Sequence, residues 1–262
     1  MAPSNPPASE RVARLRRFNV AMGALHLVSG ALMVALGNDF TLDVSSFNLN
    51  GPPGTPLVDG TVENLFGIRL AWATAAFLWL SAFFHFLVAS PVGYPTYREE
   101  LRRGRNRFRW VEYSMSATLM IVVIALITGI TDLAALIAIA FVNVAMILFG
   151  WTMEVANDSD TTPWWTPFWF GCVAGIGPWV AVFAYLAVNI NQPGAEGPPG
   201  FVYGILVTIF VLFNCFAVNQ WLQYRRVGRW SDYLFGESVY IVLSLTAKSA
   251  LAWQIFANTL ID

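Results

Sequence analysis

A single lysine stands near the middle of the last long apolar stretch of the chain, residues 240–253. Lys248 is the only lysine in the sequence, since every other basic residue is arginine. A charged group in the hydrocarbon of a membrane costs free energy, so its presence predicts a functional site. Burial favours the neutral form of an amine, and a neutral amine condenses with an aldehyde to form a Schiff base. The alternative is a lysine that snorkels to the membrane surface; about ten apolar or small residues on each side argue against it.

One carboxylate stands at comparable depth in another apolar segment. A protonated amine in hydrocarbon needs an anionic partner, and Glu112 is the only candidate that this interpretation places inside a helix bundle. Arg69 and Arg109 fall near the ends of predicted helices, where their side chains reach lipid headgroups. The alternative is that Glu112 lies at the membrane surface and pairs with Arg107 or Arg109. The presence of Lys248 favours a counterion role for Glu112.

Polar side chains fall at helical spacing around this pair. Ser244 precedes Lys248 by four residues and shares its helix face, and Ser81 and His85 are related in the same way. His26 lies near the middle of the first apolar segment. Histidine titrates near neutral pH and suits a transient proton acceptor, although a lone buried histidine is more often a hydrogen-bonded structural residue. Two histidines beside one carboxylate predict a shared polar cavity.

The other notable side chains in the apolar segments have packing roles by default. Asn143 and Asn214 are expected to hydrogen-bond between helices. Cys172 and Cys215 are interpreted as small membrane-core residues rather than as a disulfide or metal pair. Aromatic and sulfur-containing side chains are ordinary packing residues when taken singly, and together they offer a flat apolar slot for a conjugated ligand. These side chains are Trp110, Tyr113, Met115, Met146, Trp179, Phe210, Phe213 and Trp253.

Membrane helices are the elements that must position these groups. The chain has 262 residues, of which 56% are hydrophobic and only 12% charged, and its mean hydropathy is +0.57. Soluble domains carry about 25% charged residues, and apolar segments as long as these cross a membrane as helices. We therefore predict an all-α membrane protein, a single domain over residues 1–262 with seven spanning helices. The predicted spans are 14–36, 64–89, 108–130, 132–153, 165–188, 200–223 and 236–258.

The segments outside the predicted spans carry weaker signals. Residues 1–12 are expected to form a disordered tail, and no cleavable signal peptide is visible. Residues 38–62 form a polar loop. Its first part alternates in polarity from Phe40 to Val44, which predicts a short strand, and the sequence of residues 50–54 predicts a turn.

The distribution of arginine predicts an orientation in the membrane. Three predicted connectors lie on one side of the bundle: 90–107, 154–163 and 224–235. These connectors, the N-terminal region and the adjoining helix ends hold every basic residue except Arg69 and Lys248. The connector 154–163 is acidic, but acidic residues count little in this rule. We therefore predict a cytoplasmic N-terminus and an extracellular C-terminus, which makes 38–62 the first extracellular loop.

Six short blocks in sequence order give the chain a specific resemblance. A seven-helix protein with a lysine in its last helix and a carboxylate in its third resembles a retinal-binding rhodopsin, and the blocks resemble those of the heliorhodopsins. Any one block is weak evidence, whereas the ordered set spans nearly the whole chain. The blocks are NGPPGT at 50–55, FRWVEYS at 108–114, MILFGW at 146–151, FWFGC at 168–172, GFVYG at 200–204 and AKSALAWQIF at 247–256.

The resemblance implies a cofactor and a role for each candidate residue. All-trans retinal would be bound to Lys248 as a protonated Schiff base, with Glu112 as its counterion and Ser244 hydrogen-bonded nearby. The family likeness also implies a two-stranded element in the loop 38–62 and a homodimer. The remaining implied site residues are His26, Ser81 and His85 in a polar cavity, and Tyr113, Asn143, Met146, Trp179 and Phe213 around the chromophore.

The function implied by the resemblance is light sensing in the cell membrane, with a slow photocycle, no enzymatic activity and no net ion pumping. Residues 117–130 of the third span carry no second carboxylate beyond Glu112 for a proton path. The leading alternative is a light-driven proton transporter, and a third is a membrane enzyme or transporter without a pigment. The expected partners are the lipid bilayer, a second copy of the chain and an unknown cytoplasmic signalling protein at 90–107; no nucleic acid is expected. Anionic lipid is the simpler partner for that basic connector.

Overall fold

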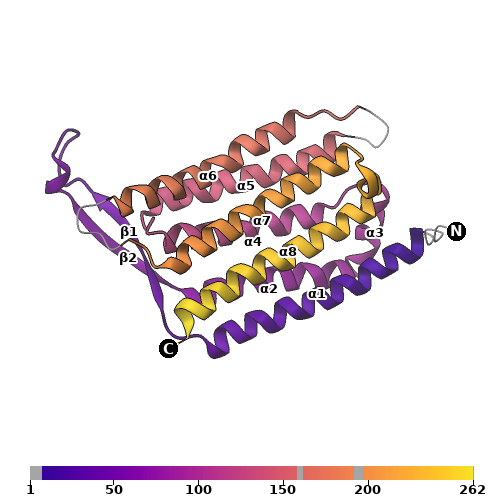
Figure 1. Cartoon of the computed structure of the whole chain (residues 1–262), viewed down its shortest axis with the longest axis horizontal. Coiled ribbons are helices and arrows are strands. Elements are labelled where there is room, and N and C mark those ends of the chain that lie inside the picture. Colours follow the sequence, from indigo (N-terminus) through magenta and orange to yellow (C-terminus); the bar gives the residue numbers. More distant parts are fainter. Residues whose placement is uncertain (1–7, 158–161, 192–196, 262) are drawn as a thin grey trace.

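The structure is a computed structural model that describes residues 8–157, 162–191 and 197–261. Within this part of the chain, seven helices are long and apolar enough to cross a membrane. They lie side by side as one bundle, and a two-stranded hairpin projects from one end (Figure 1). The seven helices are α1 (Ala8–Leu36), α2 (Leu70–Ala89), α4 (Arg107–Ile127), α5 (Leu133–Ala156), α6 (Thr166–Ile190), α7 (Gly200–Tyr224) and α8 (Tyr233–Ile255).

The two ends of the bundle differ. One end, here called the sheet end, carries strands β1 (Thr41–Asn48) and β2 (Thr61–Arg69), the short helix η1 (Leu57–Asp59), and the π-helical turn η3 (Phe256–Leu260) that follows α8. The other, here called the arginine-rich end, carries the start of α1, the short helix α3 (Tyr94–Arg102) and the 3-10 turn η2 (Gly228–Ser231). The first and the last described residues of the chain therefore lie at opposite ends of the bundle.

The structure confirms the seven predicted spans and corrects the start of the second. Residues 61–69 do not extend α2 to residue 64, because they form β2 and pair antiparallel with β1 from Thr41↔Arg69 to Asn48↔Thr61. The strand predicted at Phe40 to Val44 is present, but it begins at Thr41 and runs on to Asn48. A bulge between Val44 and Ser45 bends the hairpin. Ser45 then donates its backbone N–H to the carbonyl oxygen of Thr131 at 2.8 Å, which attaches the hairpin to the α4–α5 turn.

Two further differences lie at the arginine-rich end. Helix α1 begins at Ala8, so residues 8–12, expected in a disordered tail, are helical; residues 1–7 lie outside the described part. Val12 is buried against Tyr97 and Leu101 of α3, and this contact explains the longer helix. Helix α3 itself is absent from the sequence prediction because its composition is polar. It begins with Pro95 in its first turn, a position that suits proline.

Apolar and polar side chains occupy different halves of the interior. The main apolar core fills the half nearest the sheet end, where Leu78, Ile124, Val182, Ile205 and Leu251 are almost fully buried. Most buried polar and charged side chains lie in the other half or at the middle of the bundle. The interior is thus sealed by hydrocarbon at the sheet end and polar toward the arginine-rich end.

Candidate functional site

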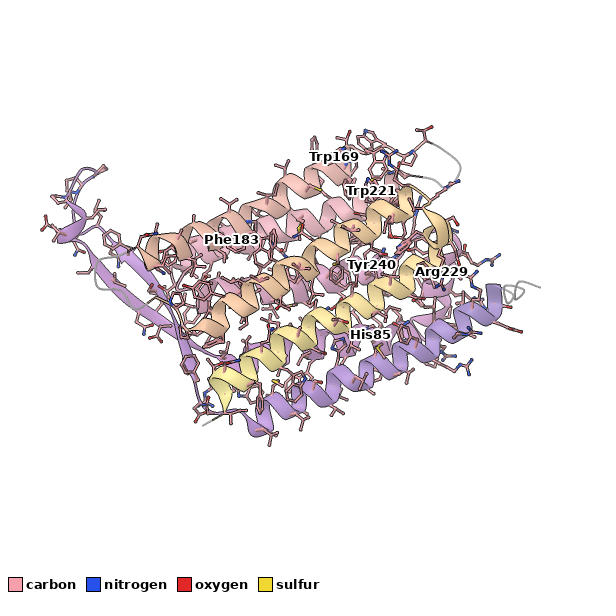
Figure 2. The ribbon with its side chains drawn as sticks, in the orientation of Figure 1. His85, Trp169, Phe183, Trp221, Arg229 and Tyr240 are labelled. Carbon is pink, nitrogen blue, oxygen red and sulfur yellow. The ribbon has the colours of Figure 1, made fainter. Side chains whose placement is uncertain are left out.

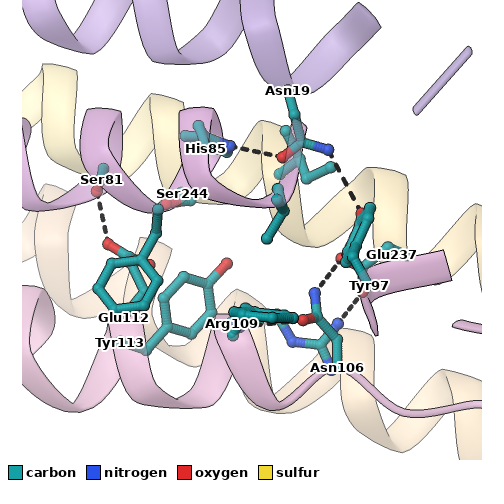
Figure 3. Close-up of a pocket in the computed structure, with 14 residues that line it drawn as sticks. Asn19, Ser81, His85, Tyr97, Asn106, Arg109, Glu112, Tyr113, Glu237 and Ser244 are labelled. Atoms are coloured by element: carbon teal, nitrogen blue, oxygen red, sulfur yellow. Dashed lines mark hydrogen bonds and ion pairs between the residues drawn. The ribbon is translucent and has the colours of Figure 1, made fainter. Parts of the chain in front are cut away.

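The lysine and the carboxylate predicted to pair are in contact. Lys248 on α8 and Glu112 on α4 are 3% and 5% exposed, and Nζ lies 3.0 Å from Oε1 of Glu112. Lys248 Nζ also donates to Ser244 Oγ at 2.6 Å, one turn earlier on α8. Ser81 Oγ of α2 donates to the same Glu112 oxygen at 2.6 Å. Three helices therefore meet at one buried ion pair. Figure 3 shows Ser81 pointing at Glu112, with Ser244 nearby.

The alternative partners of Glu112 are occupied elsewhere. Arg107 forms its ion pair with Glu100 of α3 at 2.6 Å, and Arg109 pairs with Glu154 and Glu237. The interpretation of Glu112 as a surface carboxylate paired with Arg107 or Arg109 is therefore wrong. Lys248 is the cation that balances Glu112.

The two histidines lie together beside this pair on α1 and α2. The rings of His26 and His85 stack with their centroids 5.6 Å apart and 13° between planes. His85 donates from Nδ1 to Asn19 Oδ1 at 2.7 Å. Asn19 is not among the residues predicted from the sequence. His26 is fully buried, and neither of its ring nitrogens has a protein hydrogen-bond partner among the described residues. Asn19 precedes His26 by seven residues, two helical turns, and this spacing was the available signal.

Aromatic side chains form two groups near the site. The ring of Tyr113 lies 5.0 Å from Lys248 Nζ, and its hydroxyl donates to the carbonyl oxygen of Tyr240 at 3.0 Å. Trp179 of α6 packs edge-on against Phe213 of α7, with ring centroids 5.8 Å apart. Trp179 also stacks on Phe183 of the same helix. In Figure 2, Phe183 lies nearer the sheet end than His85 does.

The remaining predicted residues have separate roles in packing. Asn143 of α5 donates to Thr118 Oγ1 of α4 at 2.9 Å, as expected for a bond between helices. Met146 of α5 packs against Gly175 of α6, where an added Cβ would lie only 2.6 Å from the methionine sulfur. Asn214 does not bond across helices as predicted. It is exposed, and it donates to the carbonyl oxygen of Phe210 one turn earlier, because its side chain points away from neighbouring helices.

Of the aromatic and sulfur-containing residues proposed for a ligand slot, some face outward or serve a second site. Met115 and Trp253 are 46% and 38% exposed, so they lie on the outer surface of the described bundle. Trp110 is buried, but its indole N–H donates to Glu154 Oε2 at 2.6 Å. Met115 and Trp253 therefore face away from Lys248, and Trp110 is hydrogen-bonded to Glu154 instead.

A second buried charge cluster lies nearer the arginine-rich end. Arg109 of α4 is ion-paired with Glu154 of α5 and Glu237 of α8, and all three side chains are buried. The guanidinium group also lies over the rings of Tyr240 and Trp110, at 4.0 and 4.8 Å from their centroids. Arg109 therefore does not reach lipid headgroups as predicted, and Glu112 is not the only carboxylate in the bundle. Here these three residues are called the arginine cluster.

A sequence signal for the arginine cluster existed in α8. Glu237 precedes Lys248 by eleven residues, which is about three helical turns, so both side chains fall on one face of α8. Its position just inside the predicted span 236–258 made it a buried carboxylate candidate. Glu154 gave no comparable signal, because it follows an apolar run and begins a polar connector.

A small cavity of about 40 Å³ lies between the lysine site and the arginine cluster. Ser81, His85 and Glu112 line one side, and Arg109 and Glu237 line the other (Figure 3). This volume has room for about two water molecules. The cavity therefore connects the lysine site with the arginine cluster through polar groups.

Helix α3 contributes one side chain to this cavity. Tyr97 is 1% exposed, and its hydroxyl donates to Glu237 Oε1 at 3.5 Å and accepts from Asn19 Nδ2 at 3.4 Å. Burial raises the pKa of Tyr97 well above its usual range, and the nearby carboxylate of Glu237 adds to this effect. The phenol therefore stays protonated and can donate a hydrogen bond at any ordinary pH.

Seven spanning helices with a buried lysine in the last and its carboxylate partner in the third define a protein of the microbial rhodopsin class. Solved structures with this fold include the transmembrane domain of a Salpingoeca rosetta rhodopsin phosphodiesterase, with a TM-score of 0.65 at 15% identity over 97% of this chain and 88% of that one. A light-driven proton pump from Leptosphaeria maculans has a TM-score of 0.61 at 14% identity, over 93% of this chain and 94% of that one. Exiguobacterium sibiricum rhodopsin has a TM-score of 0.59 at 15% identity, over 94% of each chain. At these identities the likeness establishes the fold.

The sequence model of the heliorhodopsin family matches residues 15–260, so the chain belongs to the heliorhodopsin family. Among proteins whose function is curated, none matches the sequence. Membership supports a light-sensing rhodopsin with a retinal chromophore, and it makes the chain a multi-pass integral protein of the cell membrane.

The residues present fit a retinal chromophore. Lys248 offers a buried amine whose polar partners are a carboxylate and a serine hydroxyl, so the amine is held in place and its positive charge is balanced. Trp179 and Phe213 provide flat apolar surface in the same apolar core that contains Ala247 and Leu251, the neighbours of the lysine on α8. This donor set suits an apolar aldehyde that binds covalently to an amine.

Proposed function

We propose that the chain is a light sensor in which Lys248 binds all-trans retinal as a protonated Schiff base. The observation that supports this proposal most strongly is the buried contact of 3.0 Å between Lys248 Nζ and Glu112 Oε1. The sequence contains no other lysine that could serve. Retinal bound to an amine in this way supplies absorption of visible light and isomerisation about a double bond.

Each neighbour of the amine has a distinct task in this proposal. Glu112 balances the positive charge at Nζ, and its Oε1 is the nearest carboxylate oxygen that can take a proton from Nζ. Ser81 and Ser244 hydrogen-bond to this pair and fix the orientation of both members. His85 and Asn19 extend the polar surface from Glu112 toward Tyr97, which gives the cavity a place to hold a proton.

The distribution of buried groups supports sensing without net ion pumping. A pump needs a polar path from one side of the membrane to the other. Among the described residues, the buried carboxylates are Glu100, Glu112, Glu154 and Glu237, and the half of the bundle from Lys248 to the sheet end contains none of them. A proton released at Nζ therefore finds buried carboxylates on the arginine-rich side alone. It returns to the same atom, and we expect a slow photocycle.

We extend the proposal to orientation and partners. The arginine-rich end is assigned to the cytoplasm by the positive-inside rule, and this places the C-terminus and the hairpin outside. Helix α3 is then a cytoplasmic surface on which an unknown signalling protein could bind, and the chain is proposed to act as a homodimer without enzymatic activity of its own.

The experiment is an absorption spectrum of the purified chain with added all-trans retinal. We expect a visible band that Lys248→Ala abolishes, with helix content unchanged by circular dichroism. Arg98→Ala, at an exposed position on α3, is the control and keeps the band. A chain that stays colourless, or a band that survives Lys248→Ala, contradicts the proposal.

The second candidate function is a light-driven proton transporter, which the two stacked histidines favour because they could extend a proton path. Illumination of liposomes that contain the chain, with a pH electrode in the medium, separates the two candidates. A reproducible pH change that an uncoupler removes identifies a transporter. No change, from a chain that shows the visible band, contradicts the transporter and agrees with a sensor.

A further inference from the structure

A second, larger cavity of about 550 Å³ lies on the outside of the bundle at the arginine-rich end, between α1 and the start of α8. It is here called the α1–α8 groove. One wall is a single face of α1, on which Arg11, Leu15 and Phe18 follow one another at helical spacing. The other wall is formed by η2 and the first turns of α8. Figure 2 labels Arg229 of η2 at this end of the molecule.

The groove carries an excess of positive charge. Arg11 is ion-paired with Asp232, so these two charges cancel. Arg14 and Arg229 are exposed and have no carboxylate within ion-pair distance among the described residues. Arg229 stacks on the ring of Phe235, with its guanidinium carbon 4.3 Å from the ring centroid, and this contact holds it at the groove. Two guanidinium groups are thus available to an anion.

Polarity changes along the groove in a defined direction. The charged side chains lie at its outer rim, at the first turns of α1 and in η2. Leu15 and Phe18 lie about one and two turns beyond Arg11 on α1, and Phe18 lies about one turn beyond Arg14. Leu234 and Phe235 line the groove from α8. A helix rises about 5.4 Å per turn toward the middle of the membrane. The rim therefore fits an anionic headgroup, and the deeper part fits hydrocarbon.

From this arrangement we propose that the α1–α8 groove is a binding site for one anionic phospholipid. Arg14 and Arg229 bind the phosphate, and Phe18 and Leu234 contact the first part of an acyl chain. A guanidinium group pairs with phosphate oxygens through two parallel N–H donors, which makes arginine suited to this task. The apolar continuation of the groove selects a lipid over free phosphate. The site lies on the outer surface and does not depend on the chromophore.

The test is native mass spectrometry of the purified chain, without retinal, titrated with phosphatidylglycerol or with phosphatidylcholine. We expect a saturable one-lipid complex with phosphatidylglycerol and at least about tenfold weaker binding of phosphatidylcholine, because each arginine near an anionic headgroup contributes to affinity. The double variant Arg14→Gln/Arg229→Gln is expected to lose the same factor for phosphatidylglycerol. Phe18→Ala is expected to weaken it by a smaller factor.

The matched control is Arg17→Gln/Arg98→Gln. These two arginines are exposed at the same end and lie outside the groove, so the control removes the same net charge. We expect it to bind phosphatidylglycerol like the natural chain. Equal loss in both double variants would show a diffuse charge effect and overturn the site. Displacement of the lipid by inorganic phosphate at the same concentration would show an anion site without lipid selectivity and overturn it also.

Discussion

The lysine site, formed by Lys248 and Glu112, and the arginine cluster both bury charged side chains, and both lie on helices α4 and α8. Lys248 pairs with one carboxylate, whereas Arg109 pairs with two and lies against two aromatic rings. An amine can give up its proton when its surroundings change, but a guanidinium group cannot. The lysine site therefore holds a charge that can be removed, and the arginine cluster holds one that is permanent.

This difference explains why only one of the two sites suits photochemistry. A buried group that must gain or lose a proton should have few charged partners, so that the free-energy cost of the change stays small. A site that must keep its charge needs enough partners to offset desolvation, and the arginine cluster also binds the backbone N–H of Asn106 and the indole of Trp110 through Glu154. The first site can switch, and the second gives α4, α5 and α8 a fixed junction beside it.

The largest expected effect is on the arginine cluster. Arg109→Gln leaves two buried carboxylates without their cation, and removal of one member of a buried ion pair costs about 3–5 kcal/mol. Thermal unfolding in lipid nanodiscs measures this loss against Arg98→Gln, a change at an exposed position that is expected to stay within about 0.5 kcal/mol. Equal unfolding temperatures for the two variants would show that the cluster contributes nothing to stability.

The corresponding change at the lysine site is expected to cost less stability and to move the spectrum. Glu112→Gln leaves an amine that can become neutral, so the loss is about 1–3 kcal/mol. With retinal added, we expect the visible band to shift to longer wavelength or to vanish at neutral pH, since the cation loses its anion. Glu237→Gln is the matched carboxylate-to-amide control on α8 and leaves the band in place. An unshifted band in Glu112→Gln would remove Glu112 from the counterion role.

A smaller effect is expected between the two sites, at Asn19. Asn19→Leu removes the amide that contacts both His85 and Tyr97, at a cost of about 1–2 kcal/mol for buried polar groups left without a partner. The position of the visible band is expected to stay the same, and recovery after a flash is expected to change because His85 loses its acceptor. Asn214→Leu, at an exposed position, is the control. Identical recovery in both variants would exclude Asn19 from the proton pathway.

The smallest effect concerns the partly exposed ion pair between the buried carboxylate of Glu100 and the half-exposed guanidinium of Arg107. Hydrogen bonding to Arg107 lowers the pKa of Glu100 below its ordinary value of 4.5. The folded state therefore gains stability above this value and loses it as pH falls through the lowered pKa. Arg107 is half exposed, so the gain is at most about 1 kcal/mol. Unfolding temperatures of the natural chain and Glu100→Gln should converge as pH falls from 4.5 to about 3, and a constant gap over this range would contradict the assignment.

The sequence was informative where a residue type is rare in its surroundings. A lysine and a carboxylate in apolar runs identified the ion pair, and run length identified the spans. Glu154 and Glu237 were missed because arginine and glutamate near helix ends are usually solvated there, and only tertiary packing shows that they are buried. The two-stranded element was expected from the family likeness, but the bounds of β2 were missed. Leu65, Phe66 and Ile68 resemble the start of a helix in sequence, and the pairing with β1 is a contact across a loop. Helix α3 was missed because a short polar helix owes its stability to docking, here through Tyr97.

Charges of opposite sign follow each other along both α4 and α8. From the arginine-rich end inward, α4 presents Arg109 and then Glu112, and α8 presents Glu237 and then Lys248. A slide of α8 outward would bring Lys248 toward Arg109, and a slide inward would bring Glu237 toward Glu112. Like charges in a medium of low dielectric repel strongly, so axial shear is resisted in both directions.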